Sequence, residues 1–355
     1  MKVGPILRAL EERGRGGVDV LVHTGQHYDF QMSEIFFRQL GIRDPDVHLA
    51  VGSSSQGDQC GRIMSAFEAH LMGRAEPPAG IVVVGDVTST MACALVGAKM
   101  GIPVAHVEAG LRSFDRTMPE EINRLVTDAV ADLLFVSEPA GTGNLAREGV
   151  AAERIHYVGN VMIDTLVNEL PEARALGMPA RLGLSGGGYA FVTLHRPSNV
   201  DSEERLTDVV RFLVRLGAAI PTVFPVHPRT AKRLGELGLR QRLLSAPGLH
   251  LSEPMGYRES LGLLCDARVV VSDSGGIQEE TTYLGVPCVT LRPNTERPVT
   301  VTRGTNTVVG ESLLAAWQIV TDVLAGRPKK GGAVDGWDGH AAERIVDVLL
   351  RAWSA

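Results

Sequence analysis

The segment VVVSDSGGIQEE, residues 269–280, contains the signals around which the rest of the chain is organised. Residues 269–271 form a β-branched run, which predicts a short buried strand. Ser274, Gly275 and Gly276 then permit a tight turn with no Cβ between the backbone and a ligand, and the residues that follow have the composition of a helix. Such a turn exposes backbone N–H groups beside the positive end of a helix dipole, which favours phosphate. The same turn can also join a strand to a helix without binding anything.

Length, composition and charge restrict the class of protein. The chain has 355 residues, which is typical of two domains. With 44% hydrophobic residues, only 5% aromatic residues and 40 glycines, the composition favours an α/β protein with many tight turns. The net charge of −6 argues against nucleic acid or a membrane surface as a partner, although a local basic pocket remains compatible with it.

The cysteines and histidines do not follow a metal-binding pattern. The four cysteines are widely scattered in apolar contexts, which predicts reduced core thiols. His23 and His27 could bind a metal only if they converge with carboxylates, and their spacing is not a metal signature, so we expect no metal. We find no signal peptide and no apolar run long enough to span a bilayer, and we expect a cytoplasmic protein.

Predicted strands and helices alternate along the chain, which indicates parallel sheets with right-handed crossovers. Strands are expected at 18–22, 133–137, 155–159, 189–197, 222–228, 249–254, 269–271 and 285–292. Two further segments, 81–90 and 103–113, are each expected to begin as a strand and run into a turn. The opening residues, MKVGPILRAL, instead have the spacing of a helix. Because the pattern restarts near Gly159, we predict two Rossmann-like domains that face each other across a cleft. They are residues 1–158 and residues 159–339, and a C-terminal helix (340–355) is expected to pack back on the first domain.

Acidic residues occur where predicted strands end or helices begin. Asp86 and Glu108 each follow a strand, at the edge where open α/β sheets bind ligands. Asp86 could instead cap a helix, whereas an acid between a strand and a glycine turn is poorly suited to a structural role. Glu120 follows a proline at a helix start, where an acid also stabilises the helix dipole without any function. Glu280 lies one turn after the glycine turn, where a carboxylate can accept hydrogen bonds from ribose hydroxyls.

Two His–Arg groups end consecutive strands of the second predicted domain. His195 precedes Arg196, and His227 precedes Arg229 by two residues. A lone histidine is usually structural, but two equivalent groups are plausible contacts for a diphosphate. Together with the carboxylates of the first half, they suggest that the second domain holds a nucleotide diphosphate and that the first domain acts on what is attached to it.

Eight short motifs occur in order over nearly the whole chain, and together they carry a family resemblance. They are HTGQHYD, GDVTST, HVEAGLRS, MPEEINR, HRPSN, HP, SDSGGIQEE and TERP. With this set the chain resembles the non-hydrolysing UDP-N-acetylglucosamine 2-epimerases, which have a glycosyltransferase-B-like fold. The resemblance implies interconversion of UDP-N-acetylglucosamine and UDP-N-acetylmannosamine with no cofactor, by anti elimination of UDP and its re-addition after inversion at C2.

The resemblance also implies roles for individual residues. It places Asp86, Glu108, Glu120 and His195 in catalysis. Substrate contacts are implied for Lys2, His227, Ser274, Gly275, Gly276, Glu280 and Arg297. It further implies a UDP-sugar as the partner and a homodimer. Carboxylates suit this chemistry because a weakly acidic C2 proton requires a base on one face and an acid on the other.

The chain departs from the family pattern in three places. The family begins with a strand that ends in Gly-Thr-Arg-Pro-Glu, and this sequence starts just after the place of that motif. Either the true start lies upstream of Met1, as we expect, or this form lacks an active-site arginine and the first, central strand of the N-terminal domain. Ser260 stands where many relatives have an aromatic residue that stacks on uracil, and HYDF (27–30) resembles a subgroup without substrate activation. An epimerase of UDP-2,3-diacetamido-glucuronate, a glycosyltransferase and an inactive nucleotide-sugar binder remain alternatives.

Overall fold

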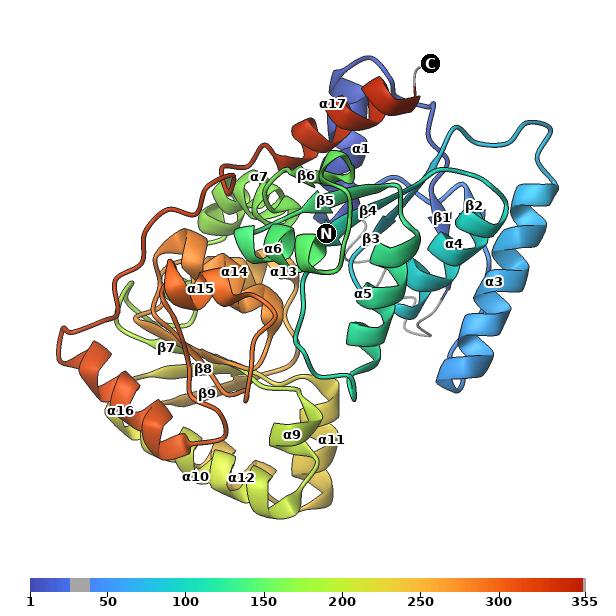
Figure 1. Ribbon diagram of the computed structural model, residues 1–355. Helices are drawn as coiled ribbons and strands as arrows, with labels where there is room; N and C mark the ends of the chain where they lie inside the picture. The colour runs from blue at the N-terminus through green and yellow to red at the C-terminus, as the bar shows by residue number, and fades with distance from the viewer. Residues whose placement is uncertain (26–38, 354–355) are drawn as a thin grey trace. The chain divides into compact units, whose positions relative to one another are not determined.

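The computed structural model describes residues 1–25 and 39–353, and the described chain forms two compact units. Residues 1–165 and 335–355 make unit 1, and residues 166–334 make unit 2 (Figure 1). The chain passes from one unit to the other within helix α7 (Val161–Ala175), a few residues after the predicted boundary at residue 159.

Unit 2 contains one sheet of six parallel strands (Figure 1). From edge to edge the strands are β12 (Asn306–Val308), β11 (Cys288–Thr290), β10 (Val269–Ser272), β7 (Ala190–Thr193), β8 (Thr222–Pro225) and β9 (Leu249–Ser252). The run that opens the sequence analysis is thus the central strand β10, and all four of its residues are buried. A strand covered on both faces needs a continuous apolar run instead of an alternating one, as the sequence of β10 predicts.

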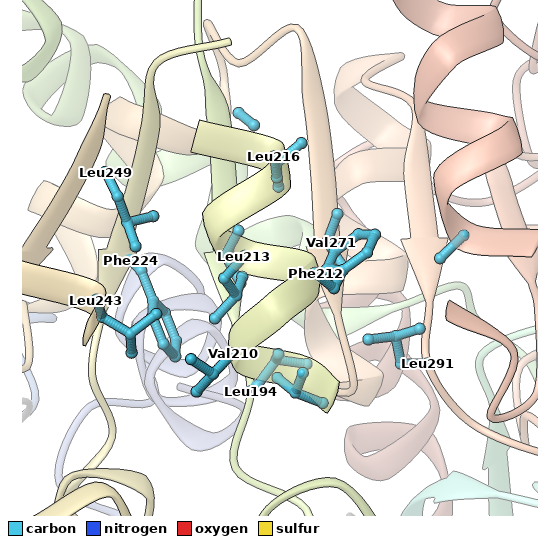
Figure 2. Packing of buried hydrophobic residues seen from close by; sticks show 14 of the residues in the cluster. Leu194, Val210, Phe212, Leu213, Leu216, Phe224, Leu243, Leu249, Val271 and Leu291 are labelled. Carbon is cyan, nitrogen blue, oxygen red and sulfur yellow. The ribbon is translucent and has the colours of Figure 1, made fainter. Parts of the chain in front are cut away.

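The helices of unit 2 alternate with these strands. They are α8 (Met178–Arg181), α9 (Pro197–Val200), α10 (Glu203–Ala219), α11 (Pro228–Glu236), α12 (Arg240–Leu244), α13 (Tyr257–Leu264), α14 (Gly275–Leu284), α15 (Pro298–Thr302) and α16 (Leu313–Leu324). Helix α10 packs on the sheet through Leu213 and Leu216, which meet Phe224 and Val271 in one buried cluster (Figure 2). Val269 and Val271 belong to that cluster because alternate residues of a strand share a face.

The described residues of unit 1 form two separate parallel sheets. Four strands lie in the order β3 (Ile81–Val84), β4 (Val104–Ala109), β5 (Leu133–Val136) and β6 (Ile155–Tyr157). Strand β1 (Val22–His23) pairs only with β2 (Val47–His48) among the described residues. The prediction of a strand over 18–22 is therefore wrong in extent, because residues 18–21 make no ladder and Val18 and Val20 are exposed.

The helices of unit 1 include one from each end of the chain. Among the described residues, the helices that lie wholly in unit 1 are α1 (Val3–Glu12), α3 (Gln56–Met72), α4 (Thr88–Lys99), α5 (Pro119–Val130), α6 (Pro139–Arg147) and α17 (Ala341–Trp353). Helix α1 confirms the helical spacing of the opening residues, with Pro5 in its first turn. Helix α17 packs against α1 (Figure 1). Ile6 of α1 and Ile345 of α17 share a buried cluster with the strand residue Val107. No helix of the described residues is long and apolar enough to cross a bilayer.

Asp164 fixes the start of α17. Its two carboxylate oxygens accept hydrogen bonds from the backbone N–H groups of Ala341 and Ala342, at 3.1 and 2.6 Å. These groups have no partner within their own helix, so the buried carboxylate replaces water as the acceptor. Burial raises the pKa of Asp164, and the two N–H donors act in the opposite direction.

We expect Asp164→Ala to lower the free energy of unfolding by about 1–2 kcal/mol, because the capped N–H groups lose their acceptor. Urea denaturation followed by circular dichroism measures this change. Asp58→Ala, which removes an exposed α3 carboxylate paired with Arg62, is the control and should change stability by less than about 0.5 kcal/mol. Equal effects of the two substitutions would contradict a capping role for Asp164.

Candidate active site

Asp86 follows β3 and is held by helix α5. Its carboxylate accepts an ion-paired hydrogen bond from Arg124 at 2.5 Å, and its backbone oxygen accepts one from Asn123 at 2.8 Å. Arg124 is 2% exposed, so it forms a fixed cation beneath the turn. The N-cap of α4 is Val87, whose side chain makes no capping hydrogen bond, so Asp86 lies one residue before the cap position.

Glu108 lies in β4 with an unusual backbone. Its φ is +75°, a region that residues other than glycine rarely adopt, and the β4–β5 register shifts between Val107 and Ala109. The buried carboxylate forms a salt bridge with Lys2, which comes from the start of α1. Backbone strain of this kind is typical of functional positions, where the surroundings hold a side chain in a required direction.

Lys2, Glu108 and the turn before Asp86 lie together at the carboxyl edge of the β3–β4 sheet. A Cβ on Gly85 would lie 2.8 Å from the Lys2 Nζ and 3.5 Å from a Glu108 carboxylate oxygen. Gly85 also has a φ of +72°, a backbone conformation that favours glycine. The structure thus brings Lys2 and Glu108, two predicted residues, together at the turn that precedes Asp86.

A buried His106–Asp128 pair connects the turns that carry these acids. The His106 Nε2 lies 2.8 Å from the carbonyl oxygen of Gly85, and because a carbonyl can only accept, this nitrogen carries a hydrogen. The Nδ1 lies 2.6 Å from Asp128, whose other oxygen accepts the N–H of Gly110 at 3.0 Å. Asp128 is also paired with Arg112 at 2.7 Å. Burial opposes ionisation of Asp128, but His106 and Arg112 hold its pKa below the usual value.

The two acids that open α5 differ in their surroundings. Glu120 is half-buried in the first turn, after Pro119 at a position that suits proline. Glu121 is buried and accepts the backbone N–H groups of Ser113 and Phe114, each at 2.9 Å. It also accepts from Arg124 at 2.8 Å. Glu121 therefore orders the 113–114 turn, and Glu120 is the member of the pair whose carboxylate is left for a ligand.

Asp273 organises the carboxyl edge of the unit 2 sheet. It accepts the backbone N–H groups of His195, at 3.0 Å, and Arg196, at 2.9 Å, and the side chain of Asn199 at 3.1 Å. The His195 Nδ1 also lies 3.0 Å from this carboxylate, so the ring directs its Nε2 away from Asp273. Burial opposes ionisation of Asp273, but the bonds from His195 and its neighbours lower its pKa overall.

His227 stands beside His195, with 5.2 Å between the ring centroids. Its Nδ1 accepts the backbone N–H of Arg229 at 3.2 Å, which requires that nitrogen to be unprotonated. Burial and the neighbouring His195 both lower the pKa of His227. The two strand-end histidines therefore converge, whereas Arg229 pairs with the exposed Asp201 at 2.5 Å.

The glycine turn begins α14, with Ser274 as its N-cap in an extended conformation. No side chain caps the helix there, so its first N–H groups are available to an anion. Arg297 covers the turn: a Cβ on Gly275 would lie 2.7 Å from its guanidinium. Arg297 is buried and paired with Glu279 at 2.7 Å and Glu296 at 2.8 Å.

Glu280 is buried one turn into α14 and accepts a hydrogen bond from the Tyr257 hydroxyl at 3.0 Å. Burial raises the pKa of Glu280 to about 7, the Tyr257 bond opposes this shift, and the neighbouring Glu279 adds to it. Ser260, one turn after Tyr257 in α13, provides no aromatic surface. The Tyr257 hydroxyl therefore orients the acid that the sequence predicts for ribose.

Several supporting residues escaped the sequence analysis. Three of them are buried and contact predicted site residues: Arg124 contacts Asp86, Asp273 contacts His195, and Tyr257 contacts Glu280. The fourth, the buried Asp128, contacts His106 and Gly110. A charged residue at a predicted strand end or on an otherwise apolar helix face is the sequence signal that could have identified Arg124, Asp128 and Asp273. His27 and the HYDF segment lie outside the described residues. Within the described residues no group of three or more His, Cys, Asp or Glu side chains is arranged to hold a metal.

Comparison with known proteins assigns this architecture to a family. The model of the family described as UDP-N-acetylglucosamine 2-epimerase matches residues 9–350. This chain belongs to the UDP-N-acetylglucosamine 2-epimerase family. Its relatives include the UDP-N-acetylglucosamine 2-epimerase of Methanocaldococcus jannaschii, 41% identical over 98% of this chain and 95% of the relative. They also include the UDP-2,3-diacetamido-2,3-dideoxy-D-glucuronate 2-epimerase of Pseudomonas aeruginosa, 39% identical over 94% and 91%.

Solved structures support the same assignment. The crystal structure of the M. jannaschii enzyme in complex with UDP-GlcNAc and UDP matches with a TM-score of 0.88 at 40% identity, over 99% of this chain and 96% of that one. The Neisseria meningitidis enzyme bound to UDP-GlcNAc has the same TM-score at 26% identity, over 99% and 96%. The α/β fold with parallel sheets and the family resemblance predicted from the motifs are therefore confirmed.

Glu280 makes stability depend on pH. An acid whose pKa rises from 4.5 to about 7 on folding keeps its proton in the folded state while the unfolded state has lost it. Its contribution is therefore complete below pH 4.5 and is lost as the pH rises through 7, a change of about 3 kcal/mol. We expect Glu280→Gln to lose less stability than the parent between pH 5 and pH 7.5, as measured by urea denaturation.

Glu259→Gln, on the neighbouring helix α13, is the control for the Glu280 experiment. Because Glu259 is only half-buried, the control should keep the parent's pH dependence. Identical pH dependence in the parent, the Glu280→Gln variant and the control would contradict a protonated Glu280 in the folded state.

Proposed function

We propose that the chain interconverts UDP-N-acetylglucosamine and UDP-N-acetylmannosamine. The observation that carries the proposal is its full-length similarity, at 40% identity, to a structure that contains UDP-GlcNAc and UDP. The geometry of each unit supports the proposal as well. Unit 1 contains acids that could transfer protons, and unit 2 contains a helix-start turn that could bind a phosphate group. The reaction requires a base at C2, a group for the leaving diphosphate and a site for the nucleoside.

The carboxylates of unit 1 are proposed to move the C2 proton. A base removes it, the C2–H electron pair forms the C1–C2 double bond, and UDP leaves C1 with the electrons of the C1–O bond. UDP then re-adds to C1 while a proton returns to C2 on the opposite face. Asp86, Glu108 and Glu120 are the candidates for these transfers, and Lys2 beside Glu108 supplies a nearby positive charge.

The residues of unit 2 are proposed to hold UDP. A departing diphosphate gains negative charge, which N–H groups at Ser274, Gly275 and Gly276 can stabilise together with His195 and His227. Glu280 is proposed to accept from ribose hydroxyls, and Arg297 to provide a cation behind the turn. Two buried carboxylates hold the Arg297 guanidinium in place, and it lies against Gly275. We therefore propose that Arg297 also orders the glycine turn.

A second candidate substrate is UDP-2,3-diacetamido-glucuronate. The relative that carries this name is 39% identical to the chain, almost as similar as the M. jannaschii enzyme. Both substrates undergo inversion at C2, so the same acids would serve either reaction. We also propose that the protein is a cytoplasmic homodimer. Neither property distinguishes between the two candidate substrates.

Proton NMR in deuterated water tests the proposed activity. Incubation with UDP-N-acetylglucosamine alone should give a mixture of two UDP-sugars with deuterium at C2 and without any acceptor. Glu108→Gln should lower kcat by at least about 100-fold, because a proton-transfer group is lost. Glu68→Gln, on the exposed face of α3, should match the parent. Exchange with the diacetamido-glucuronate substrate alone would replace the proposed substrate, and consumption only with an acceptor would indicate a transferase.

A substitution at Asp273 tests how His195 is oriented. We expect Asp273→Asn to lower kcat about 100-fold with a smaller change in KM, because the ring loses its charged acceptor while UDP keeps its other contacts. Asp201→Asn is the matched control, an exposed carboxylate paired with Arg229, and should change kcat less than twofold. Unchanged kcat in Asp273→Asn would rule out this role.

A further inference from the structure

A network of buried amide and hydroxyl side chains lies behind the glycine turn of unit 2. Gln278 of α14 and Asn306 of β12 form its centre, and both are 0% exposed. Thr290, Thr295 and Thr300 complete the set, which we call the Gln278 network. A buried polar group is tolerated only when its donors and acceptors are paired, so the bonds of each member decide what the network does.

The two ends of the Gln278 amide have different kinds of partner. The Gln278 Oε1 accepts from the Thr295 hydroxyl at 2.7 Å and from the Asn306 Nδ2 at 3.0 Å. The Gln278 Nε2 donates to the carbonyl oxygen of Ser274 at 3.3 Å. Because a carbonyl oxygen can only accept, the nitrogen of this amide must face Ser274 and its oxygen must face Asn306.

Backbone carbonyl groups set the direction of every hydrogen bond in the network. Since Gln278 turns its oxygen to Asn306, the Asn306 amide must donate to it. The Thr300 hydroxyl donates to the carbonyl oxygen of Arg297 at 2.8 Å, so it can accept from the Asn306 Nδ2, at 3.1 Å. Reversal of either amide would place two acceptors face to face. The network therefore has one arrangement in which its bonds are made.

The network joins the two parts of the proposed diphosphate site in unit 2. Ser274 is the N-cap of α14, and Gln278 holds its carbonyl oxygen. The backbone of Arg297 is held on both sides, since its N–H donates to the Thr295 hydroxyl at 3.1 Å and its carbonyl accepts from Thr300. The guanidinium of the same residue covers the glycine turn. The first residue of the turn and the arginine above it therefore share one set of buried partners.

We propose that Gln278 is a positioning residue for the diphosphate group of a UDP-sugar. It acts through the Ser274 carbonyl and the Arg297 backbone and does not touch the ligand, because its amide is buried and has protein partners at both ends. The inference rests on the proposed function and adds to it a residue that sets the geometry of the anion turn. A preorganised turn binds an anion more tightly, since its N–H groups need not reorient.

Calorimetric titration with UDP tests this role without turnover. Gln278→Glu keeps the size and the accepting oxygen of the side chain but replaces its donor with a second oxygen. When ionised, that oxygen repels the Ser274 carbonyl, and when protonated it donates to the carbonyl as the amide does. We expect the variant to bind UDP at least about tenfold more weakly than the parent at pH 8.5 and within about twofold of the parent at pH 5.5.

Two comparisons separate this recovery from other effects of pH. Each affinity is divided by that of the parent at the same pH, because Glu280 and His227 of the same unit also titrate over this range. Gln241→Glu, on the exposed helix α12, is the matched control and should bind UDP as the parent does at both pH values. Gln278→Met, which has no amide donor, should bind weakly at both.

Thr295 provides a test that leaves the buried centre of the network in place. It is half-buried, and its hydroxyl connects Gln278 to the backbone N–H of Arg297. Thr295→Val removes this hydroxyl at nearly constant volume and should weaken UDP binding by about three- to tenfold. Thr295→Ser keeps the hydroxyl and should restore the affinity of the parent.

The outcomes distinguish this inference from the proposed function on which it rests. Parent-like binding by Gln278→Glu at pH 8.5 would overturn the inference, and so would binding by this variant that stays weak at pH 5.5. Equal affinities of Thr295→Val and Thr295→Ser would also contradict it. A parent that does not bind UDP would instead overturn the proposed function, together with what rests on it.

Discussion

The geometry of both units depends on buried carboxylates that tie together the turns at the carboxyl edges of their sheets. Asp128 joins the turn after β3, through His106, to the turn after β4, through Gly110. Asp273 likewise joins the β7 turn, at His195, to the end of β10. A buried carboxylate is tolerated only when its oxygens have donors. The Asp128 and Asp273 carboxylates therefore fix the conformation of the turns that they connect. The side chains that these turns carry are positioned as a result.

The same constraint separates supporting acids from acids that can react. Glu121 and Asp128 use their oxygens on backbone N–H groups and arginines, so they have little capacity left for a ligand. Asp86 has one buried arginine partner, and Glu108 is held in a strained backbone beside Lys2. In unit 2, the buried Asp273 carboxylate holds the His195 ring, which is itself 34% exposed. Adjacent residues of one motif, such as Glu120 and Glu121, therefore have different surroundings: the Glu121 carboxylate is bound to backbone N–H groups and Arg124, whereas Glu120 is half-buried in the first turn of α5.

How far the sequence predicts this molecule depends on the range of each interaction. Local signals were sufficient for the glycine turn of α14, for Pro119 at the start of α5 and for the central strand β10. The residues that align the site were missed because their partners are remote: Arg124 meets Asp86 across 38 positions, and Asp273 meets His195 across 78. The prediction of a strand over residues 18–22 was wrong in extent for a related reason. Its apolar pattern predicts burial, but a strand exists only where a neighbour supplies a ladder.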